Sequence, residues 1–600
     1  MCGIGLAITK NSEDHNLIAE RINNYQLYRG PDFSQVKNYP NFSICHQRLS
    51  IIDLNKRSNQ PFKYKNIEII FNGEIYNFQF LKKELIGIGY DFKTTSDTEV
   101  IAVGIHYHGK NFLKKLDGMF AICWIDKLQK KIYLTADPFG IKQIYYYKYK
   151  NIFIATSELF VLRDVIRQMR YQISENNSNL NYFTSYLSLP LYETPFNEIK
   201  SLCNGSLISI NIESKESDID YKFYESFVPK NYSNKVAFTD DLIIDKVFNE
   251  SFQADVNQAI LLSGGIDSTN LAISSNNSKN KLSGYCINTN LSSDGYSDDL
   301  KYAKIVARNE KIPLKIINYD RTINVGQVID TLKRLKNIGE FSSALSLNYL
   351  FNSISADSIK VVYSGLGADE MYGGYTLMKN YKFLRRFSNA SNLLKDKLSF
   401  SQSFLIKKIE FLEPIFNRNR IKLLKLIIKN NSKNFISNLI TWDLEVQKNY
   451  SNSSIDITNY SDLVDFYFNY FLSSSHLPIA DSISMSHSLE LRVPFLSRRI
   501  YDSVYPALKK TCGLKKILLK RLENKYDKKF LNRKKSGLGV STLNLNDEVI
   551  HFLIDNLFDK YIETRYDITK DGLYQKLKNK NLVRFPYMLF SLLTYDKATK

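Results

Sequence analysis

The stretch QAILLSGGIDS, residues 258–268, joins a short apolar run directly to a glycine-rich turn. The run at 258–262 has the length of a buried strand, and the residues from Asp267 onward suit the start of a helix. In such a turn glycines allow backbone N–H groups to converge, serine hydroxyls add donors, and the helix N-terminus favours anions. The stretch therefore predicts a phosphate-binding loop. Because it lacks the GxxxxGK[ST] pattern, it is not a Walker loop.

Strand and helix patterns continue to alternate after this loop. Short apolar runs occur at 284–288, 314–318 and 360–363, with a helical pattern at 301–309 between the first two. This alternation predicts βαβ units and a parallel sheet, which is an α/β fold. Residues 380–475 have no strand-like alternation, so we expect a helical segment there.

A second glycine-rich loop, SGLGADE at 364–370, ends the apolar run at 360–363. Its Asp369 and the earlier Asp267 offer hard oxygen ligands, so both are candidates for holding Mg²⁺ between phosphates. Further on, Lys516 begins the stretch KILLK. Its ammonium is a candidate for contacting a phosphate of a ligand bound at these loops.

The N-terminal part of the chain has a different pattern. Short β-type runs separated by turn signals lie at 67–71, 120–125, 131–135, 144–149 and 151–155. A polar, irregular stretch follows at 213–240. We therefore expect a strand-rich domain at 1–212, a linker at 213–240 and the α/β domain at 241–600.

Cys2 follows the initiator methionine, and removal of Met1 would give one residue both a thiol and a free α-amino group. Such an amine has an ordinary pKa of about 7.7–8, so part of it is neutral at pH 7 and can act as base for the thiol. Asn72 and Gly73 follow an apolar run. There a side-chain amide and a backbone N–H can point at one spot, which suits an oxyanion hole.

Charged residues nearby suit an amino-acid substrate. Arg48 is a candidate for holding a substrate carboxylate through a bidentate fork. Glu74 and Asp97 add carboxylates that are candidates for holding a substrate ammonium. The set fits an amino acid whose side chain carries a hydrolysable carbonyl.

These motifs together resemble the class II glutamine amidotransferases, the N-terminal-nucleophile glutaminase domains. In order they are MCGI, RGPD, RLSIID, FNGEIYN, SDTEV, GMFA and DPFGIK. The resemblance covers about residues 2–210 and implies an αββα sandwich. It also implies a role for each candidate: attack on the glutamine amide by Cys2, oxyanion stabilisation by Asn72 and Gly73, and glutamine binding by Arg48, Glu74 and Asp97.

The phosphate loop resembles the PP-loop of ATP pyrophosphatases, and the order of all the motifs resembles glutamine-hydrolysing asparagine synthetases everywhere except at 380–475. The resemblance implies that the second domain adenylates a carboxylate, with aspartate as the expected acceptor and ATP with Mg²⁺ as co-substrate. Ammonia would cross an apolar tunnel and displace AMP. Lys516 would be catalytic, and Asp267 and Asp369 would hold the metal. The residues implied for ATP are Ser263, Gly264, Gly265, Asp267, Ser268, Ile287, Ser364 and Gly365.

Some positions depart from the family pattern. Leu366 stands where asparagine synthetases commonly have glutamate, which is a candidate base for the incoming ammonia, and leucine cannot accept a proton. Ser497 replaces the aspartate of a PFLD motif, Ser482 an arginine, Lys520 the arginine of a KxxLR motif, and Gln143 a proline. The acceptor therefore stays open between aspartate and another carboxylate, such as a uronic-acid sugar in surface polysaccharide synthesis.

Composition limits the other classes of function. The 600 residues carry a net charge of +20, but the basic runs are short. Nucleic-acid binding, as in PP-loop proteins that modify tRNA, is an alternative that the glutaminase motifs disfavour, and a binding protein with inactive sites is another. No apolar run approaches the roughly 18–20 residues that cross a bilayer. Six cysteines without a CxxC pair exclude a disulfide scaffold and fit a cytoplasmic protein. The expected partners are small molecules, and dimers in the family leave a homodimer open.

Overall fold

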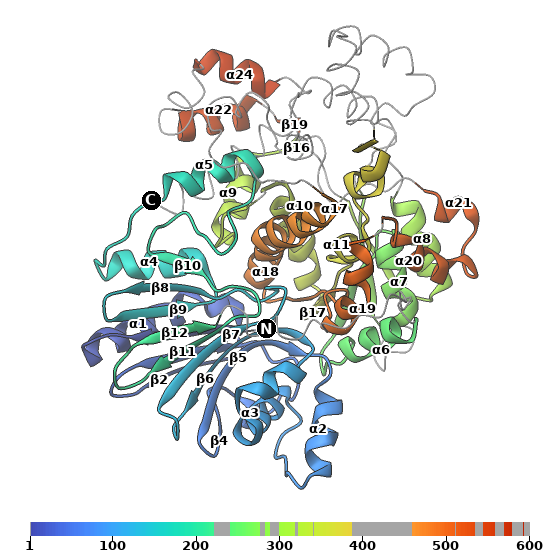
Figure 1. The fold of residues 1–600 in the computed structure, drawn as a ribbon. Coiled ribbons are helices and arrows are strands. Elements are labelled where there is room, and N and C mark those ends of the chain that lie inside the picture. The colour runs from blue at the N-terminus through green and yellow to red at the C-terminus, as the bar shows by residue number, and fades with distance from the viewer. Residues whose placement is uncertain are drawn as a thin grey trace.

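The computed structural model describes residues 2–220, 241–275, 282–288, 299–318, 322–339, 341–383, 385–386, 459–510, 512–533, 544–545, 547–558, 569–578 and 592. These residues form two parts with different architectures. An antiparallel sandwich occupies the N-terminal part, and a parallel sheet with helices occupies the C-terminal part (Figure 1). The predicted two-domain fold is thereby confirmed.

The sandwich consists of two six-stranded antiparallel sheets. The first has the order β10(Ile199–Ser201), β8(Tyr145–Tyr149), β9(Ile152–Thr156), β1(Cys2–Ile8), β3(Ser43–Arg48) and β2(Phe33–Asn38). The second has the order β12(Ser217–Asp220), β11(Leu207–Asn211), β7(Lys131–Ala136), β6(Gly118–Asp126), β5(Ile67–Ile75) and β4(Phe62–Tyr64). The five predicted strand runs therefore correspond to β5 to β9. The predicted linker contains β12, and its residues 221–240 lie outside the described part of the chain.

Helices cover the outer face of each sheet. The first sheet carries α1(Ser12–Tyr25) and α4(Leu159–Gln168), and the second carries α2(Phe78–Gly87) and α3(Asp97–His108) (Figure 1). The remaining helical segments of this part are η1(Leu27–Arg29), η2(Lys56–Ser58), η3(Gly109–Lys115) and α5(Asn177–Tyr186). The layers are therefore helix, sheet, sheet, helix, as the resemblance implied.

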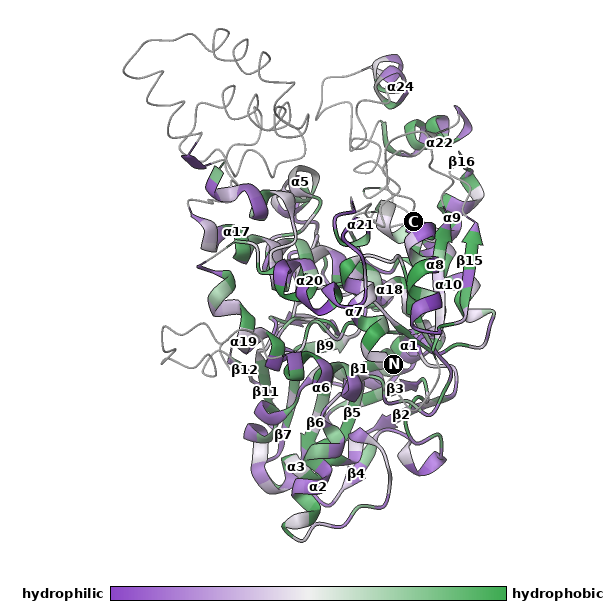
Figure 2. Ribbon diagram, turned by 90° about the vertical axis from the view of Figure 1, so that its right-hand side faces the viewer, coloured by the Kyte–Doolittle hydropathy of each residue, from purple (hydrophilic) through white to green (hydrophobic). Residues whose placement is uncertain are grey.

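Period-two patterning explains why the strands stack in this way. In β6, Ala121, Cys123 and Ile125 enter the core between the two sheets, whereas Phe120 and Trp124 enter the core beneath α2 and α3. Both faces of the strand are thus buried, because successive side chains point to opposite faces of a sheet. Figure 2 shows the same pattern as mostly apolar strands in this part of the molecule.

The C-terminal part is built on a five-stranded sheet. Its order is β15(Leu314–Asn318), β14(Ser283–Asn288), β13(Gln258–Leu261), β17(Val361–Tyr363) and β18(Glu490–Arg492), with every pair parallel. The chain leaves β13 toward β14 on one side and returns to β17 on the other. The carboxyl end of β13 is therefore the switch point of the sheet, where open α/β sheets bind ligands.

The C-terminal part also contains helices, of which some pack against this sheet. They are α6(Asp241–Ser251), α7(Ile266–Ser275), α8(Asp299–Asn309), α9(Val325–Arg334), α10(Phe341–Ser355), α11(Ala368–Tyr372), α17(Tyr460–Phe466), the π-helix η6(Tyr467–His476), α18(Leu477–Ser486), α19(Arg498–Leu508), α20(Lys515–Glu523), α21(Lys528–Leu531), α22(Asp547–Leu557) and α24(Lys570–Lys578). A two-stranded ladder pairs β16(Thr322–Ile323) with β19(Asn544–Leu545). Within the segment predicted to be helical, α17 and η6 are helical, and residues 387–458 lie outside the described part.

Buried ion pairs join the two parts close to the first residue of β1. Arg29 lies 2.7 Å from Glu158 and 2.8 Å from Asp481, and Lys142 lies 2.7 Å from Asp481. Although burial opposes it, Arg29 and Lys142 lower the pKa of Asp481 to about 2. Arg29 Nε also donates to the carbonyl of Cys2 at 3.1 Å. Breaking a buried ion pair would leave one buried charge without a partner, which is strongly unfavourable. This cluster therefore fixes the start of β1 against the second domain.

In the described part of the chain, no helix combines the length and the apolar character required to cross a membrane.

Candidate active sites

A pocket with about 360 Å³ of empty space opens beside Cys2, where β1, β3 and β5 end close together. Cys2 lies opposite Arg48 in the β1–β3 ladder. The N-terminus of α3 lies at the same place, since Ser96, Asp97 and Thr98 line the pocket. Ser96 caps this helix by accepting from the N–H of Thr98. The residues that line the pocket are Cys2, Arg48, Leu49, Ile51, Ile52, Ser58, Gln60, Phe71, Gly73, Glu74, Ser96, Asp97, Thr98 and Glu490.

Asn72 is held so that its amide nitrogen stays available. Its Oδ1 accepts from the backbone nitrogen of Cys2 at 2.9 Å. Its Nδ2 is buried and has no partner among the described residues. Burial raises the pKa of the Cys2 thiol, while Arg48 opposes that rise, so the neutral thiol is favoured at rest. The geometry therefore offers one available hydrogen-bond donor, Asn72 Nδ2, and a Cys2 thiol that needs a base to become a nucleophile.

Gly73 is required at its position by a close approach of the backbone. Its φ is +152°, and a Cβ there would lie 2.0 Å from the carbonyl oxygen of Met119. Gly73 lies opposite Phe120 in the β5–β6 ladder, one residue after Asn72. Any side chain at this position would push β5 away from β6, and it would displace both candidate oxyanion donors.

Two carboxylates face the pocket in strongly desolvated positions. Burial raises the pKa of Asp97 to about 6, against the hydrogen bond that Asp97 accepts from the N–H of Ile75. Burial also raises the pKa of Glu74, which Arg492 opposes from 2.9 Å. Glu74 Oε1 has no hydrogen-bond partner among the described residues. Both groups are therefore placed to gain from a substrate cation.

Arg48 lines the pocket and also holds the loop that closes it. Its Nη1 donates to the carbonyl of Asn55 and to Asn59, and its Nη2 donates to the carbonyls of Ile52 and Asp53. The side chain is 4 % exposed. Both terminal nitrogens are thus engaged, so the structure places Arg48 at the pocket wall with its fork turned to the loop.

Glu490 is a pocket residue that the sequence did not single out for this site. It comes from β18 of the second domain, yet it lines the same pocket as Cys2. A signal was present in the alternation Glu490-Leu491-Arg492, because residues two apart share one face of a strand. Nothing in the sequence said that this face would meet the first domain.

The phosphate loop lies between β13 and α7, as predicted. Gly264 has a φ of +64°, and a Cβ there would lie 2.4 Å from the backbone of Tyr302. Ser263 Oγ accepts from the N–H of Gly265 and lies 3.2 Å from Ser268 Oγ. The hydroxyls and N–H groups of the loop therefore gather at the N-terminus of α7, where an anion is favoured.

The second glycine-rich loop lies beside the first. A Cβ at Gly365 would lie 2.8 Å from the Cβ of Asp267, so the two loops touch. Ser364 is fixed by donating its N–H to the carbonyl of Arg492 at 3.0 Å. The predicted Ile287 is half-buried near the end of β14, the strand next to β13. The predicted nucleotide residues thus lie on neighbouring strand ends.

Lys515 joins the two candidate metal ligands. Its Nζ lies 2.5 Å from Asp267 Oδ1 and 2.6 Å from Asp369 Oδ1, and the lysine is 5 % exposed. Lys516, the lysine favoured from the sequence, has an exposed side chain and lies outside this cluster. Lys515 and not Lys516 reaches the two aspartates because Lys515 shares the buried face of α20 with Leu518 and Leu522, at helical spacing.

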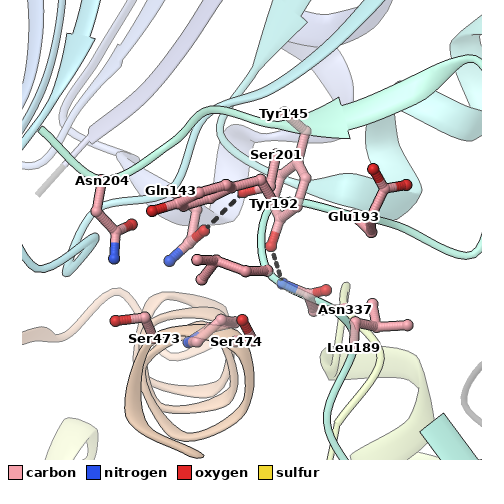
Figure 3. A pocket seen from close by; sticks show the side chains of 12 residues that line it. Gln143, Tyr145, Leu189, Tyr192, Glu193, Ser201, Asn204, Asn337, Ser473 and Ser474 are labelled. Atoms are coloured by element: carbon pink, nitrogen blue, oxygen red, sulfur yellow. Dashed lines mark hydrogen bonds between the residues drawn. The ribbon is translucent and has the colours of Figure 1, made fainter. Parts of the chain in front are cut away.

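A second pocket, with about 390 Å³ of empty space, lies between the two domains (Figure 3). Gln143 donates to the carbonyl of Gly140 at 2.5 Å and accepts from Ser201 at 3.2 Å. Asn337 from the second domain donates to the hydroxyl of Tyr145 at 2.5 Å. Gln143 thus stabilises this turn through hydrogen bonds. At this position the family that the motifs resemble usually has proline.

Two of the serines that depart from the family pattern line neither of the two pockets. Ser497 donates to Asp117 of the first domain at 2.8 Å. Ser482 accepts from the N–H of Lys336 at 2.8 Å. Of the departures named above, Leu366 is the one in a loop of the nucleotide site, where it packs half-buried against the apolar core.

Comparison with known proteins finds a match for each of the two domains. Residues 1–224 match the family described as glutamine amidotransferase domain, and residues 240–586 match asparagine synthase. Asparagine synthetase 1 of Bacillus subtilis is 28% identical and covers 94% of this chain and 92% of its own. A putative asparagine synthetase of Mycobacterium tuberculosis is 26% identical, over 84% and 81%.

Among solved structures, a glutamine phosphoribosylpyrophosphate amidotransferase from B. subtilis aligns with a TM-score of 0.28 and 14% identity, over 52% of this chain and 65% of that one. The assignment to a family rests on the matches in sequence, one of which spans more than half of the chain. The chain belongs to the asparagine synthase family and carries a glutamine amidotransferase domain at its N-terminal end.

Proposed function

We propose that this chain is a glutamine-dependent asparagine synthetase. It would hydrolyse glutamine at Cys2 and use the ammonia to amidate aspartate activated by ATP, giving asparagine, glutamate, AMP and pyrophosphate. One observation carries the proposal: a cysteine pocket with an available amide donor and a lysine–aspartate cluster on a phosphate loop occur in one chain. The relatives named as asparagine synthetases support aspartate as the acceptor.

The first reaction belongs to the Cys2 pocket. The thiol would attack the amide carbon of glutamine, with the α-amine of Cys2 as base once Met1 is removed. The developing oxyanion would accept from the Gly73 N–H and from Asn72 Nδ2, which supports this role because it lacks another partner. The proton passes to the departing nitrogen, ammonia leaves, and water cleaves the thioester to glutamate.

Ammonia would then cross between the domains through apolar surroundings. Leu49, Ile51, Tyr76 and Met119 of the first domain belong to the same continuous core as the second domain's sheet. In water at pH 7 most ammonia is protonated and cannot act as a nucleophile. A passage along this core would therefore keep it neutral.

The second reaction belongs to the phosphate loop. Asp267 and Asp369 fit a bound Mg²⁺, because one cation, the Lys515 ammonium, already reaches an oxygen of each. When bound, the metal would neutralise phosphate charge. Lys515 would hold the α-phosphate while the acceptor carboxylate displaces pyrophosphate. Ammonia then attacks the acyl carbon and AMP leaves.

The raised pKa of Asp97 predicts a pH dependence of glutamine use. Burial raises that pKa to about 6, so Asp97 becomes protonated as the pH falls through this value and loses its attraction for a substrate ammonium. The KM for glutamine is expected to rise about tenfold per pH unit below about 6. Asp97→Asn should raise KM at every pH and weaken the dependence, leaving the part that comes from Glu74. Initial rates of glutamate formation measure both, and a pH-independent KM in the wild type would contradict the role.

Asp267→Asn tests the proposed metal site. The substitution keeps the size of the side chain and removes the charge that Lys515 and Mg²⁺ both require. Pyrophosphate release is expected to fall by about 10²-fold or more with glutamine or ammonia as nitrogen source. Glutamine hydrolysis at Cys2 serves as the control for folding. Unchanged pyrophosphate release would remove Asp267 from the reaction.

Leu366 favours a second candidate, in which the acceptor is another carboxylate such as a uronic-acid sugar. An asparagine synthetase commonly has glutamate there, and leucine cannot take a proton from ammonia. A nearby carboxylate, Glu370, is 1 % exposed and accepts a hydrogen bond from Tyr375. If aspartate is the acceptor, we propose Glu370 as the substitute base.

Transfer of labelled nitrogen distinguishes these acceptors. Glutamine with an isotopically labelled amide is incubated with ATP–Mg²⁺ and either L-aspartate or a nucleotide-linked uronate. Label in asparagine supports the proposal, and label only in a uronamide supports the second candidate. Label that appears only as free ammonia with both acceptors would contradict both.

We also propose a cytoplasmic location, which six free cysteines support.

A further inference from the structure

Arg492 lies at the centre of a buried charge cluster on the boundary between the domains. The guanidinium is fully buried, 2.5 Å from Glu490 and 2.9 Å from Glu74. Its Nη1 donates to the carbonyls of Ser251 and Gln253 at 2.7 and 2.6 Å. The side chain is therefore held by two carboxylates and two carbonyls at once.

This cluster forms part of the glutamine pocket. Glu74 and Glu490 both line the pocket beside Cys2, although they come from different domains. Arg492 binds Oε2 of Glu74, which leaves Oε1 without a partner among the described residues. The second domain therefore supplies a wall of the pocket and fixes which oxygen of Glu74 faces the substrate.

The balance of charge explains why Arg492 needs a second carboxylate. With Glu74 as its one anionic partner, Arg492 would cancel the charge that Glu74 offers to a substrate ammonium. Glu490 supplies a further negative charge, and Arg492 in turn lowers the pKa of Glu490 in spite of burial. Because Glu490 balances the charge of Arg492, the cluster becomes net negative when Glu74, whose pKa burial raises, ionises beside a cationic substrate group.

We propose that Glu490 and Arg492 are positioning residues that complete the glutamine-binding site from the synthetase domain. Arg492 orients Glu74, and Glu490 balances the charge of Arg492 so that the carboxylate of Glu74 is left to hold the α-ammonium of glutamine. The inference rests on the proposed function, and it adds a determinant of glutamine affinity that lies outside the amidotransferase domain.

Glu490→Gln tests this inference, because glutamine has the same size and can still accept from Arg492 Nε. The KM for glutamine is expected to rise about tenfold, because the cluster loses one negative charge close to the substrate ammonium. The kcat for hydrolysis should change less than about threefold, since Cys2, Asn72 and Gly73 are untouched. Arg492→Lys, which keeps the charge but cannot reach all four partners, should also raise KM. Ammonia-dependent pyrophosphate release reports folding of each variant.

A matched control uses an ion pair that crosses the same boundary elsewhere. Arg499 lies 2.6 Å from Asp117 and does not line the Cys2 pocket. Arg499→Met should leave the KM for glutamine unchanged. If Arg499→Met raises this KM as much as Glu490→Gln does, the effect is a general loosening of the boundary and the inference is wrong.

Alkylation of Cys2 separates recognition of the ammonium from reactivity of the thiol. A chloroketone analogue of glutamine carries the α-ammonium, and iodoacetamide does not. Glu490→Gln is expected to slow labelling by the chloroketone about tenfold without slowing labelling by iodoacetamide. Equal effects on both reagents, or a wild-type KM in Glu490→Gln, would overturn the inference. A wild-type chain that hydrolyses no glutamine would instead overturn the proposed function beneath it.

Discussion

Cys2→Ala is expected to lower glutamine-dependent amidation by roughly 10³-fold or more and to leave ammonia-dependent amidation close to the wild-type rate. Alanine keeps the small apolar volume of the buried position, so the start of β1 and its contact with Arg29 should survive. The loss should therefore be chemical, since no other group of the pocket can form the thioester.

The two nitrogen sources are compared in one assay of the amidated product. Cys2→Ser is a useful companion, because a hydroxyl is a far weaker nucleophile than a thiol but fits the same space. Equal loss with glutamine and with ammonia would contradict the assignment of two separate sites. Retained use of glutamine would show that Cys2 is not the nucleophile.

Lys515→Met is expected to lower pyrophosphate release by about 10²- to 10³-fold with either nitrogen source. Methionine matches the length of lysine but removes the charge that lies 2.5 Å from Asp267 and 2.6 Å from Asp369. The α-phosphate then loses its cation as pyrophosphate departs. Hydrolysis of glutamine should continue at the wild-type rate, because the Cys2 pocket does not include Lys515.

Lys516→Met provides the matched comparison one residue further along α20. The side chain of Lys516 is exposed, so its removal should change pyrophosphate release by less than about twofold. The opposite result, with Lys516→Met inactive and Lys515→Met active, would restore the assignment made from sequence and contradict the geometry of this cluster.

The sequence predicted the fold well because its strands are short and separated by clear turn signals. The runs at 67–71 and 258–262 correspond to β5 and β13, and the alternation after residue 258 gave the parallel sheet. The chain beyond 212 was harder to interpret. Ser217–Asp220 forms an edge strand, β12, whose polar residues do not show the apolar alternation of a buried strand.

The sites were predictable where motifs carry the chemistry and less so where tertiary contacts decide. Asn72 and Gly73 lie at the Cys2 pocket, as the motif implied. Two adjacent lysines fit the same sequence pattern, and helical spacing from Leu518 and Leu522 marks Lys515 as the buried one. Glu490 could not be found in this way, since its place in the pocket arises only when the two domains meet.

We propose that one chain couples glutamine hydrolysis to ATP-dependent amidation of aspartate. An assay of pyrophosphate release from ATP–Mg²⁺ and glutamine, with and without L-aspartate, together with analysis of the amino acids formed, tests this coupling. Pyrophosphate release is expected to depend on aspartate, with asparagine and glutamate as products. Glutamate formation without aspartate-dependent pyrophosphate would contradict it and would leave a glutaminase that serves another carboxylate.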